Sequence, residues 1–230
     1  MRSHPHAESL RKLKAIKILE NGEPLVSLQE YPLQLHPDVL PYLRHEVAER
    51  LVLAQSQLPK DYRLLLIDGL HAPSLVQEKW EDHYKKLEYE HPFWPAAFLR
   101  RATSHAFTPH NHRVPPAHTT GGAIDVILTD TSGKIFDLVP PLTDWNLGHV
   151  YSNKVPVGAQ HRRRILLEAM EAAGFSNYPH AYWHYSYGDS GWAARQGHKV
   201  CFYGPIHGID DLKKAVSENE TTETILEITS

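Results

Sequence analysis

Residues 109–130 read PHNHRVPPAHTTGGAIDVILTD, and this stretch decides the fold. Its first half is rich in proline, glycine and histidine and cannot hold one regular element, so it predicts a loop. Its second half alternates like a strand. The chain therefore passes from a loop carrying His118, through a Gly-Gly turn, into a strand carrying Asp125. Glycine lets the backbone fold closely, so that an imidazole and a carboxylate can approach one metal ion.

Taken alone, this pair of residues has a second interpretation. His118 then caps a turn and Asp125 accepts backbone hydrogen bonds, which is the commoner role of an isolated pair. A third potential ligand is needed to favour metal binding.

Outward from this stretch, the sequence predicts helices and strands in mixed order. Residues 63–69 (RLLLIDG) form a short apolar run closed by Asp-Gly, which predicts a buried strand ending in a turn. Residues 133–139 predict a strand that returns antiparallel to 122–130 as a hairpin. Amphipathic helices are predicted over residues 37–58, 73–89 and 157–173, and further strands over 181–187 and 199–206.

The third of these helices carries three consecutive arginines, Arg162, Arg163 and Arg164. Consecutive helix positions point in different directions, so the three side chains predict a solvated stretch. We therefore expect no phosphate-binding site there.

The bulk composition is that of an ordinary globular protein. Its 230 residues, 41% of them hydrophobic, fit one domain, predicted over residues 1–215 with a polar tail over 216–230. The net charge of -3 gives no basic surface for nucleic acid, and no apolar run is long enough for a signal peptide or a membrane span. Cys201 is the only cysteine, so an intramolecular disulfide is impossible and the cytoplasm fits. The sequence leaves the oligomeric state open.

The third potential ligand is His184, within the aromatic run PHAYWHYSYGD at residues 179–189. The pattern His-x-x-Gly-x-Ala-x-Asp is complete from His118 to Asp125. About sixty residues later come Gly-Phe-x-Asn-Tyr-Pro at 174–179 and then the aromatic run. In this order the motifs resemble those of the D-alanyl-D-alanine dipeptidase family of zinc metallopeptidases.

This resemblance extends from Leu66 through Trp192, roughly the middle two thirds of the chain. It implies an α+β fold with an antiparallel sheet and flanking helices, and it implies that His118, Asp125 and His184 bind one Zn²⁺. Two histidines and one carboxylate leave an open position on a tetrahedral ion, as in catalytic zinc sites. The same ligand set suits Fe²⁺. The common Fe²⁺ oxygenases, however, place the carboxylate two residues after the first histidine rather than seven, so iron is the weaker alternative.

The sequence departs from the family at three positions around the predicted metal. Ala181 replaces the glutamate that moves the proton during hydrolysis. His71 replaces the arginine that stabilises the oxyanion, and Pro116 replaces a serine. Losing a general acid/base typically forfeits about 10²–10⁴ in rate, so the changes predict altered chemistry.

Two histidines are candidates to supply the missing catalytic groups. His180 is next to the vacated glutamate position and is a candidate proton shuttle, although a surface or packing role is equally favoured. His71 is a candidate donor to the oxyanion, without the forked geometry of a guanidinium. Substrate contacts are predicted for Tyr182, Trp183 and His112, the last in the histidine-rich loop.

The sequence thus predicts a cytoplasmic, zinc-dependent, dipeptidase-like hydrolase acting on D-Ala-D-Ala or a related small dipeptide or amino-acid-derived substrate. Two alternatives stand beside it. One is a repurposed metal enzyme that catalyses a cyclisation, an elimination or an Fe²⁺-dependent oxidation. The other is a non-catalytic metal-binding homologue. The identity of the metal helps to separate them.

Overall fold

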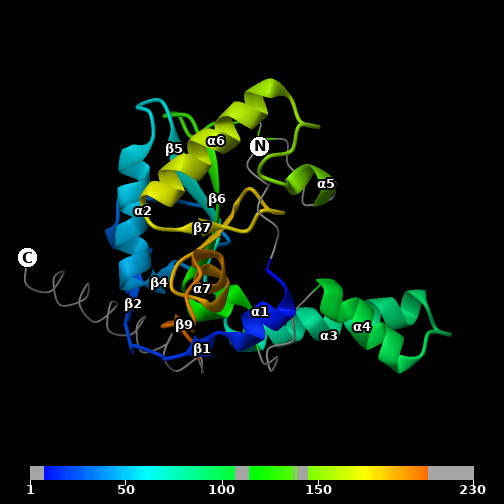
Figure 1. Cartoon of the computed structure of the whole chain (residues 1–230). Coiled ribbons are helices and arrows are strands. Elements are labelled where there is room, and N and C mark those ends of the chain that lie inside the picture. Colours follow the sequence, from blue (N-terminus) through cyan, green and yellow to red (C-terminus); the bar gives the residue numbers. More distant parts are fainter. Residues whose placement is uncertain (1–7, 107–113, 137, 139–144, 207–230) are drawn as a thin grey trace, which may run out of the picture.

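A five-stranded sheet lies at the centre of the computed structural model, which describes residues 8–106, 114–136, 138 and 145–206 (Figure 1). Its strand order is β3-β5-β6-β8-β7, and only the pair β3 and β5 runs parallel. The strands are β3 (Gln34–Leu35), β5 (Arg63–Asp68), β6 (Ala123–Thr129), β8 (His184–Ser186) and β7 (Ser176–Asn177). The α+β class is therefore confirmed, with a sheet that is antiparallel except at one edge.

Two short strand pairs lie outside this sheet. They are the parallel pair β1 (Lys17–Ile18) with β9 (Val200–Cys201) and the antiparallel pair β2 (Leu25–Ser27) with β4 (Tyr42–Arg44). The predicted strand over 199–206 is thus reduced to its two residues in β9. The first of these pairs joins the N-terminal part of the described chain to its C-terminal part.

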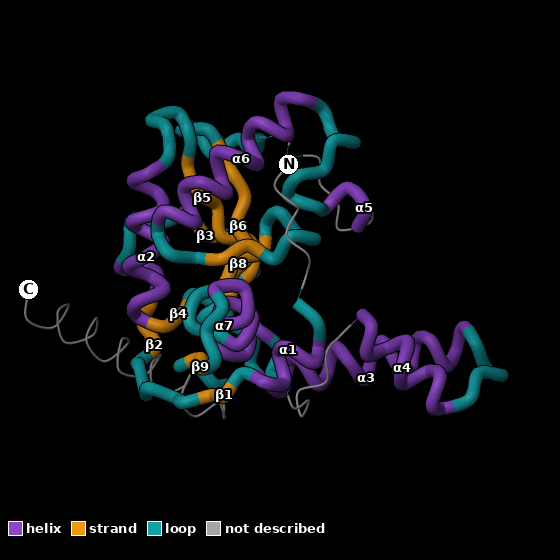
Figure 2. The backbone as a smooth tube through the Cα atoms, in the orientation of Figure 1, coloured by secondary structure: helices purple, strands orange, loops and turns teal. Residues whose placement is uncertain are grey.

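Two helices, which lie beside the sheet in Figure 2, contribute side chains to the buried core. They are α2 (His45–Gln57) and α6 (Val157–Ala172). Val47 and Leu51 of α2 join Leu166 and Met170 of α6 in one buried cluster with the apolar residues of β5 and β6, of which Val126 is fully buried. Burial at three- and four-residue spacing is what made these helices predictable. The candidate site is therefore supported by strands that pack on a buried apolar core.

The remaining helices lie around the lower part of the molecule in Figure 1 and at its side. Figure 1 shows α3 and α4 as a hairpin that projects away from the sheet. The helices are α1 (Leu10–Ala15), α3 (Pro73–Glu90), α4 (Ala96–Ala106), α5 (Trp145–Gly148) and α7 (Ser190–Gln196). Pro73 stands in the first turn of α3, as predicted, because its missing N–H has no partner to lose there. None of the helices described is long and apolar enough to cross a bilayer.

The predicted start of the first helix was wrong. The apolar spacing that suggested a helix from residue 37 includes Leu43, which lies instead in β4 and pairs with Val26 of β2. Leu43 is fully buried in this strand, and the Leu28 backbone N–H donates to the Pro41 carbonyl just before it. Helix α2 begins only at His45, because strand pairing holds the preceding three residues extended.

Two predicted strands are shorter than the sequence suggested. Among the described residues, the hairpin of 122–130 with 133–139 consists of one bridge between Thr129 and Ile135 and two hydrogen bonds across it. They run from the Phe136 N–H to the Leu128 carbonyl and from the Asp130 N–H to the Lys134 carbonyl. The predicted strand over 181–187 is confined to β8, because residues before His184 form a turn. His112, the tail and the predicted domain end at residue 215 lie outside the described residues.

The prediction of a solvated arginine stretch was wrong for Arg163, whose side chain is fully buried. Its guanidinium donates to the carbonyl oxygens of Leu138 (2.7 Å), Leu147 (2.7 Å) and His149 (3.1 Å). It also lies over the ring of Tyr182, 4.0 Å from the ring centroid. A buried arginine held by carbonyl groups and a π face fixes the segment around α5 against α6.

Replacing Arg163 by methionine is expected to lower the free energy of unfolding by about 3 kcal/mol, because several buried carbonyl groups lose their donor. The matched control is Arg164→Met at the neighbouring exposed position, expected to change it by less than about 0.5 kcal/mol. Urea unfolding followed by circular dichroism measures both. Equal effects at the two positions would contradict the buried role of Arg163.

Candidate metal centre

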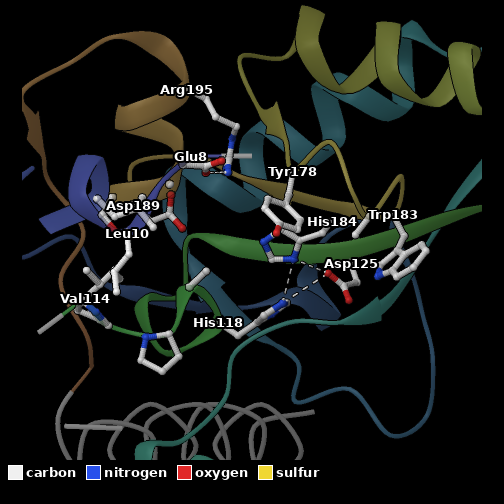
Figure 3. Close-up of a pocket in the computed structure, with 17 residues that line it drawn as sticks. Glu8, Leu10, Val114, His118, Asp125, Tyr178, Trp183, His184, Asp189 and Arg195 are labelled. Carbon is white, nitrogen blue, oxygen red and sulfur yellow. Dashed lines mark hydrogen bonds and ion pairs between the residues drawn. The ribbon is translucent and has the colours of Figure 1, made fainter. Parts of the chain in front are cut away.

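Three side chains from three different elements converge on one face of the sheet. His118 lies in the 3₁₀ turn Ala117–Thr120, Asp125 in β6 and His184 at the start of β8. Asp125 and His184 are direct partners in the β6–β8 register, so their side chains share one face of the sheet. Figure 3 shows the two imidazoles and the carboxylate pointing toward one another.

The separations between the donor atoms fit one small divalent cation. His118 Nε2 and His184 Nδ1 are 3.2 Å apart, and Asp125 Oδ1 lies 2.8 Å from His184 Nδ1 and 3.4 Å from His118 Nε2. Zinc ligands at 2.0–2.1 Å in a tetrahedron stand about 3.3 Å from one another. These three residues could therefore hold a metal ion with little movement.

The electrostatics of the cluster favour a positive charge between its members. Burial acts to lower the pKa of His118, but attraction to the Asp125 carboxylate outweighs it and raises the pKa to about 9. Burial acts to raise the pKa of Asp125, but attraction to His118 and hydrogen bonds from both histidines outweigh it and hold the pKa below its ordinary value. The carboxylate thus stays ionised and stabilises a cation beside it. A metal ion bound by deprotonated ligands takes the place of the protons.

The orientation of His118 is fixed from behind. Its Nδ1 donates to the Gly69 carbonyl oxygen at 2.7 Å, which leaves Nε2 directed at the cluster. A backbone carbonyl on the second ring nitrogen is the usual way in which proteins orient a metal-binding histidine. The end of β5 therefore supports the ligand carried by the loop.

The Gly-Gly turn between His118 and Asp125 is required by close packing. Gly121 has φ +68°, in the left-handed region that favours glycine. A Cβ on Gly122 would stand 2.5 Å from the Tyr187 carbonyl oxygen and 2.8 Å from the Tyr203 ring. The turn lets β6 begin in contact with the residues that follow β8, and so brings His118 and His184 together.

Gly122→Ala is expected to lower the free energy of unfolding by about 1–3 kcal/mol, because the added methyl group overlaps a backbone atom. Gly158→Ala in α6 is the control. Its Cβ would meet an arginine side-chain nitrogen at 3.5 Å, and we expect stability unchanged or raised by about 0.5 kcal/mol. Thermal unfolding compares them, and a Gly122 variant as stable as the control would contradict the close approach.

The cluster opens on a cavity of about 450 Å³. The cavity wall includes His118, Asp125 and His184 and extends from Trp183 across Tyr178 to residues of α1 and α7 (Figure 3). Its lining contains the apolar side chains Leu10, Leu13, Val114 and Trp183. A small organic molecule therefore fits beside the candidate metal.

The position of the missing glutamate faces this cavity. Ala181 is buried and belongs to the cavity wall, in the turn that precedes β8. Asn177 holds that turn, since its side-chain amide donates to the carbonyl oxygens of Ala181 (3.0 Å) and His184 (2.9 Å). A longer side chain at position 181 would thus extend into the cavity that the three ligand candidates also line.

The structure does not bring His180 to the cluster. Its side chain is exposed, and its ring packs near those of His149 and Tyr178, with centroids 5.4 and 5.7 Å away. It is not among the residues that line the cavity. The turn explains the difference, because neighbouring residues there point to opposite sides and Ala181 takes the inward direction.

His71 lies beside the cluster rather than in the cavity wall. Its Nε2 donates to Asp68 Oδ1 at 2.7 Å, and its ring stacks on His118 with centroids 4.9 Å apart. The hydrogen bond from His71 and attraction to His118 outweigh burial and lower the pKa of Asp68. Asp68, His71 and His118 also have ligand atoms within 4.8 Å of one another, so they form a second, overlapping group of metal-ligand type.

Of the two described residues that were predicted to contact the substrate, one lies in the cavity wall and the other does not. Trp183 lines the cavity, whereas Tyr182 is 4% exposed and packs under Arg163 on the other side of the chain. Glu8 and Arg195 were not predicted at the site, yet both line the cavity and form an ion pair with each other. Their separation of 187 residues in sequence leaves no local pattern that could have revealed them.

The sheet of this α+β protein presents two histidines and one carboxylate to a cavity, and this is the donor set that catalytic mononuclear metal sites use. The sequence match then gives the family. The model of the D-Ala-D-Ala dipeptidase family of M15 peptidases matches residues 41–201, and the chain belongs to this family. The resemblance inferred from the motifs is thus confirmed.

The individual proteins that resemble this chain share 30% or less of their sequence with it. A D-alanyl-D-alanine dipeptidase of Synechocystis sp. is 30% identical over 157 residues, which cover 60% of this chain and 58% of that protein. The chain therefore spans little more than half of that relative's length. Among solved structures, the vancomycin-resistance D,D-pentapeptidase VanY in complex with Zn(II) is 17% identical over 81% of this chain and 96% of its own, with a TM-score of 0.35. VanYB in complex with D-alanine-D-alanine is 14% identical over 80% and 93%, also with a TM-score of 0.35.

Proposed function

We propose that this chain is a zinc-dependent, dipeptidase-like hydrolase that acts on D-Ala-D-Ala or a related small dipeptide. The observation that carries the proposal is the spacing of 2.8–3.4 Å among the donor atoms of His118, Asp125 and His184 at the wall of a cavity, in a member of this family. When bound, zinc supplies a Lewis acid that polarises the scissile carbonyl group and lowers the pKa of water.

The protein side chains contribute binding, orientation and exclusion of water. The apolar wall around Trp183 holds the substrate beside the three ligands and lowers the local polarity. His71, fixed by Asp68 and stacked on His118, is proposed as a donor toward the developing oxyanion. His180 has no part in this proposal, because its side chain is exposed and its ring packs near His149 and Tyr178, whereas His71 contacts the proposed ligand His118.

The missing glutamate limits the expected rate. With Ala181 at that position, no side chain of the described cavity wall stands in the family's place for the general acid/base. We therefore expect turnover below that of a family member with the glutamate by about 10²–10⁴.

The test is release of free D-alanine from D-Ala-D-Ala by zinc-loaded protein, with the His184→Ala variant as the blank. The proposal expects slow turnover that this substitution abolishes. Turnover no higher than the blank, at enzyme concentrations that would reveal a rate 10⁴-fold below an ordinary dipeptidase, would overturn it.

Ala181 also favours a second candidate, a metal enzyme whose reaction needs no carboxylate at that position. The two-histidine, one-carboxylate set suits Fe²⁺ as well as Zn²⁺, so oxidation of an amino-acid-derived substrate belongs to this candidate. Metal analysis of the purified protein and oxygen uptake by the Fe²⁺-loaded form test it. Zinc as the bound metal, with no oxygen uptake, would remove the oxidative form.

A further inference from the structure

A buried ion pair lies in the cavity wall at the end formed by α1 and α7. Glu8 stands just before α1, and Arg195 belongs to α7. Their side chains are 5% and 13% exposed, and Arg195 NH1 donates to Glu8 Oε1. Both residues line the cavity that holds the three candidate metal ligands, and Figure 3 shows them together across the cavity from Trp183.

The guanidinium of Arg195 is already occupied by acceptors. Its Nε donates to Ser176 Oγ at 2.9 Å, its NH2 group donates to Ser186 Oγ at 2.5 Å, and its NH1 group donates to Glu8. Every nitrogen therefore has a partner within the protein. NH1 retains one further N–H, and the acceptor of the pair that lacks a donor is what a ligand can satisfy.

That acceptor is Glu8 Oε2. The atom is buried and has no hydrogen-bond partner among the described residues, although the other oxygen of the same carboxylate is paired. A buried carboxylate oxygen without a donor is unfavourable, and such groups in folded proteins usually find one. The neighbouring carboxylate Asp189 differs, since its Oδ1 accepts from Ser186 Oγ (2.9 Å) and from the Trp192 N–H (2.6 Å) at the start of α7.

The missing partner is a donor group. Arg195 already balances the charge of the carboxylate through Oε1, and a cationic donor makes the stronger, charge-assisted hydrogen bond to the remaining oxygen. The cavity lining near Glu8 contributes the apolar side chains Leu10 and Leu13, and it contains no lysine and no arginine other than Arg195. We propose that Glu8 recognises the free amino group of a peptide substrate whose scissile bond lies at the metal cluster. This inference rests on the proposed peptidase function and adds to it a residue that sets specificity for a free N-terminus.

A purely structural role for Glu8 makes a different prediction. The ion pair also connects the segment before α1 to α7, so losing it would disturb the cavity for every ligand alike. An ordered water on Oε2 would likewise leave free and acylated amines equal. The ratio of affinities for the two forms of one peptide therefore isolates recognition of the amine.

The experiment compares D-Ala-D-Ala and L-Ala-D-Ala-D-Ala, each with a free and with an N-acetylated amino group. Dissociation constants for zinc-loaded protein are measured by calorimetry in the cold, where hydrolysis is slow. Glu8→Gln keeps an acceptor oxygen for Arg195 but replaces Oε2 by a group that cannot accept. Glu78→Gln, on the exposed side of α3, is the matched control, and thermal unfolding verifies that both variants are folded.

We expect the wild type and the Glu78 variant to bind the free amine of at least one of the two peptides about tenfold or more tightly than its acetylated form. Glu8→Gln is expected to bring this ratio to about one. Equal binding of both forms by the wild type, or an unchanged ratio in a folded Glu8 variant, would overturn the inference and leave the peptidase proposal standing. Binding of neither peptide in either form would overturn both.

Discussion

Ala181→Glu is expected to raise the rate of D-Ala-D-Ala hydrolysis by about 10²–10⁴, the usual contribution of a general acid/base. Position 181 is buried, lines the cavity and stands in a turn held by Asn177. A glutamate introduced there is directed at the cluster of His118, Asp125 and His184. Steady-state release of D-alanine measures the gain.

His180→Glu is the matched control for this gain. It introduces the same carboxylate one residue earlier, at an exposed side chain outside the cavity wall, and we expect no increase in rate. A gain at position 180 equal to that at 181 would show that the turn does not direct side chains as the structure has it. No gain at either position would mean that the pocket has been remodelled for another reaction.

Asp125→Ala is expected to weaken Zn²⁺ binding by about 100-fold or more, because it removes a ligand and the charge that stabilises the cation between the two histidines. Competition with a chromophoric chelator measures the affinity. Asp68→Ala is the control, since Asp68 pairs with Asp125 across β5 and β6 but belongs to the overlapping group with His71. We expect the Asp68 variant to lose much less affinity, and a loss as large as that of the Asp125 variant would assign the metal to the overlapping group.

The sequence predicted those parts of the molecule in which a short pattern decides the conformation. The apolar run at 63–68, the spacing in α6 and Pro73 at the start of α3 each act within a few residues, and the structure has all three elements. The start of α2 was mispredicted because the pairing of β4 with β2 is a contact between separate segments. Helical spacing alone cannot reveal that contact.

In the candidate site, too, the features that depend on a local motif were predictable and those that depend on distant contacts were not. Its three proposed ligands belong to motifs with fixed spacing, and the structure brings them together. The direction of His180 depends on a turn that the alternation of a strand does not describe. The side chains of Arg163 and Glu8 are buried by partners far away in the sequence, so no local pattern could predict their burial.

The central claim is that His118, Asp125 and His184 hold one zinc ion. The most direct measurement is an anomalous difference map from a crystal of the zinc-loaded protein, recorded on both sides of the zinc absorption edge. The account predicts one peak at about 2.0–2.2 Å from His118 Nε2, Asp125 Oδ1 and His184 Nδ1. A crystal with no peak among these three atoms, or with its peak between Asp68 and His71 instead, would contradict it.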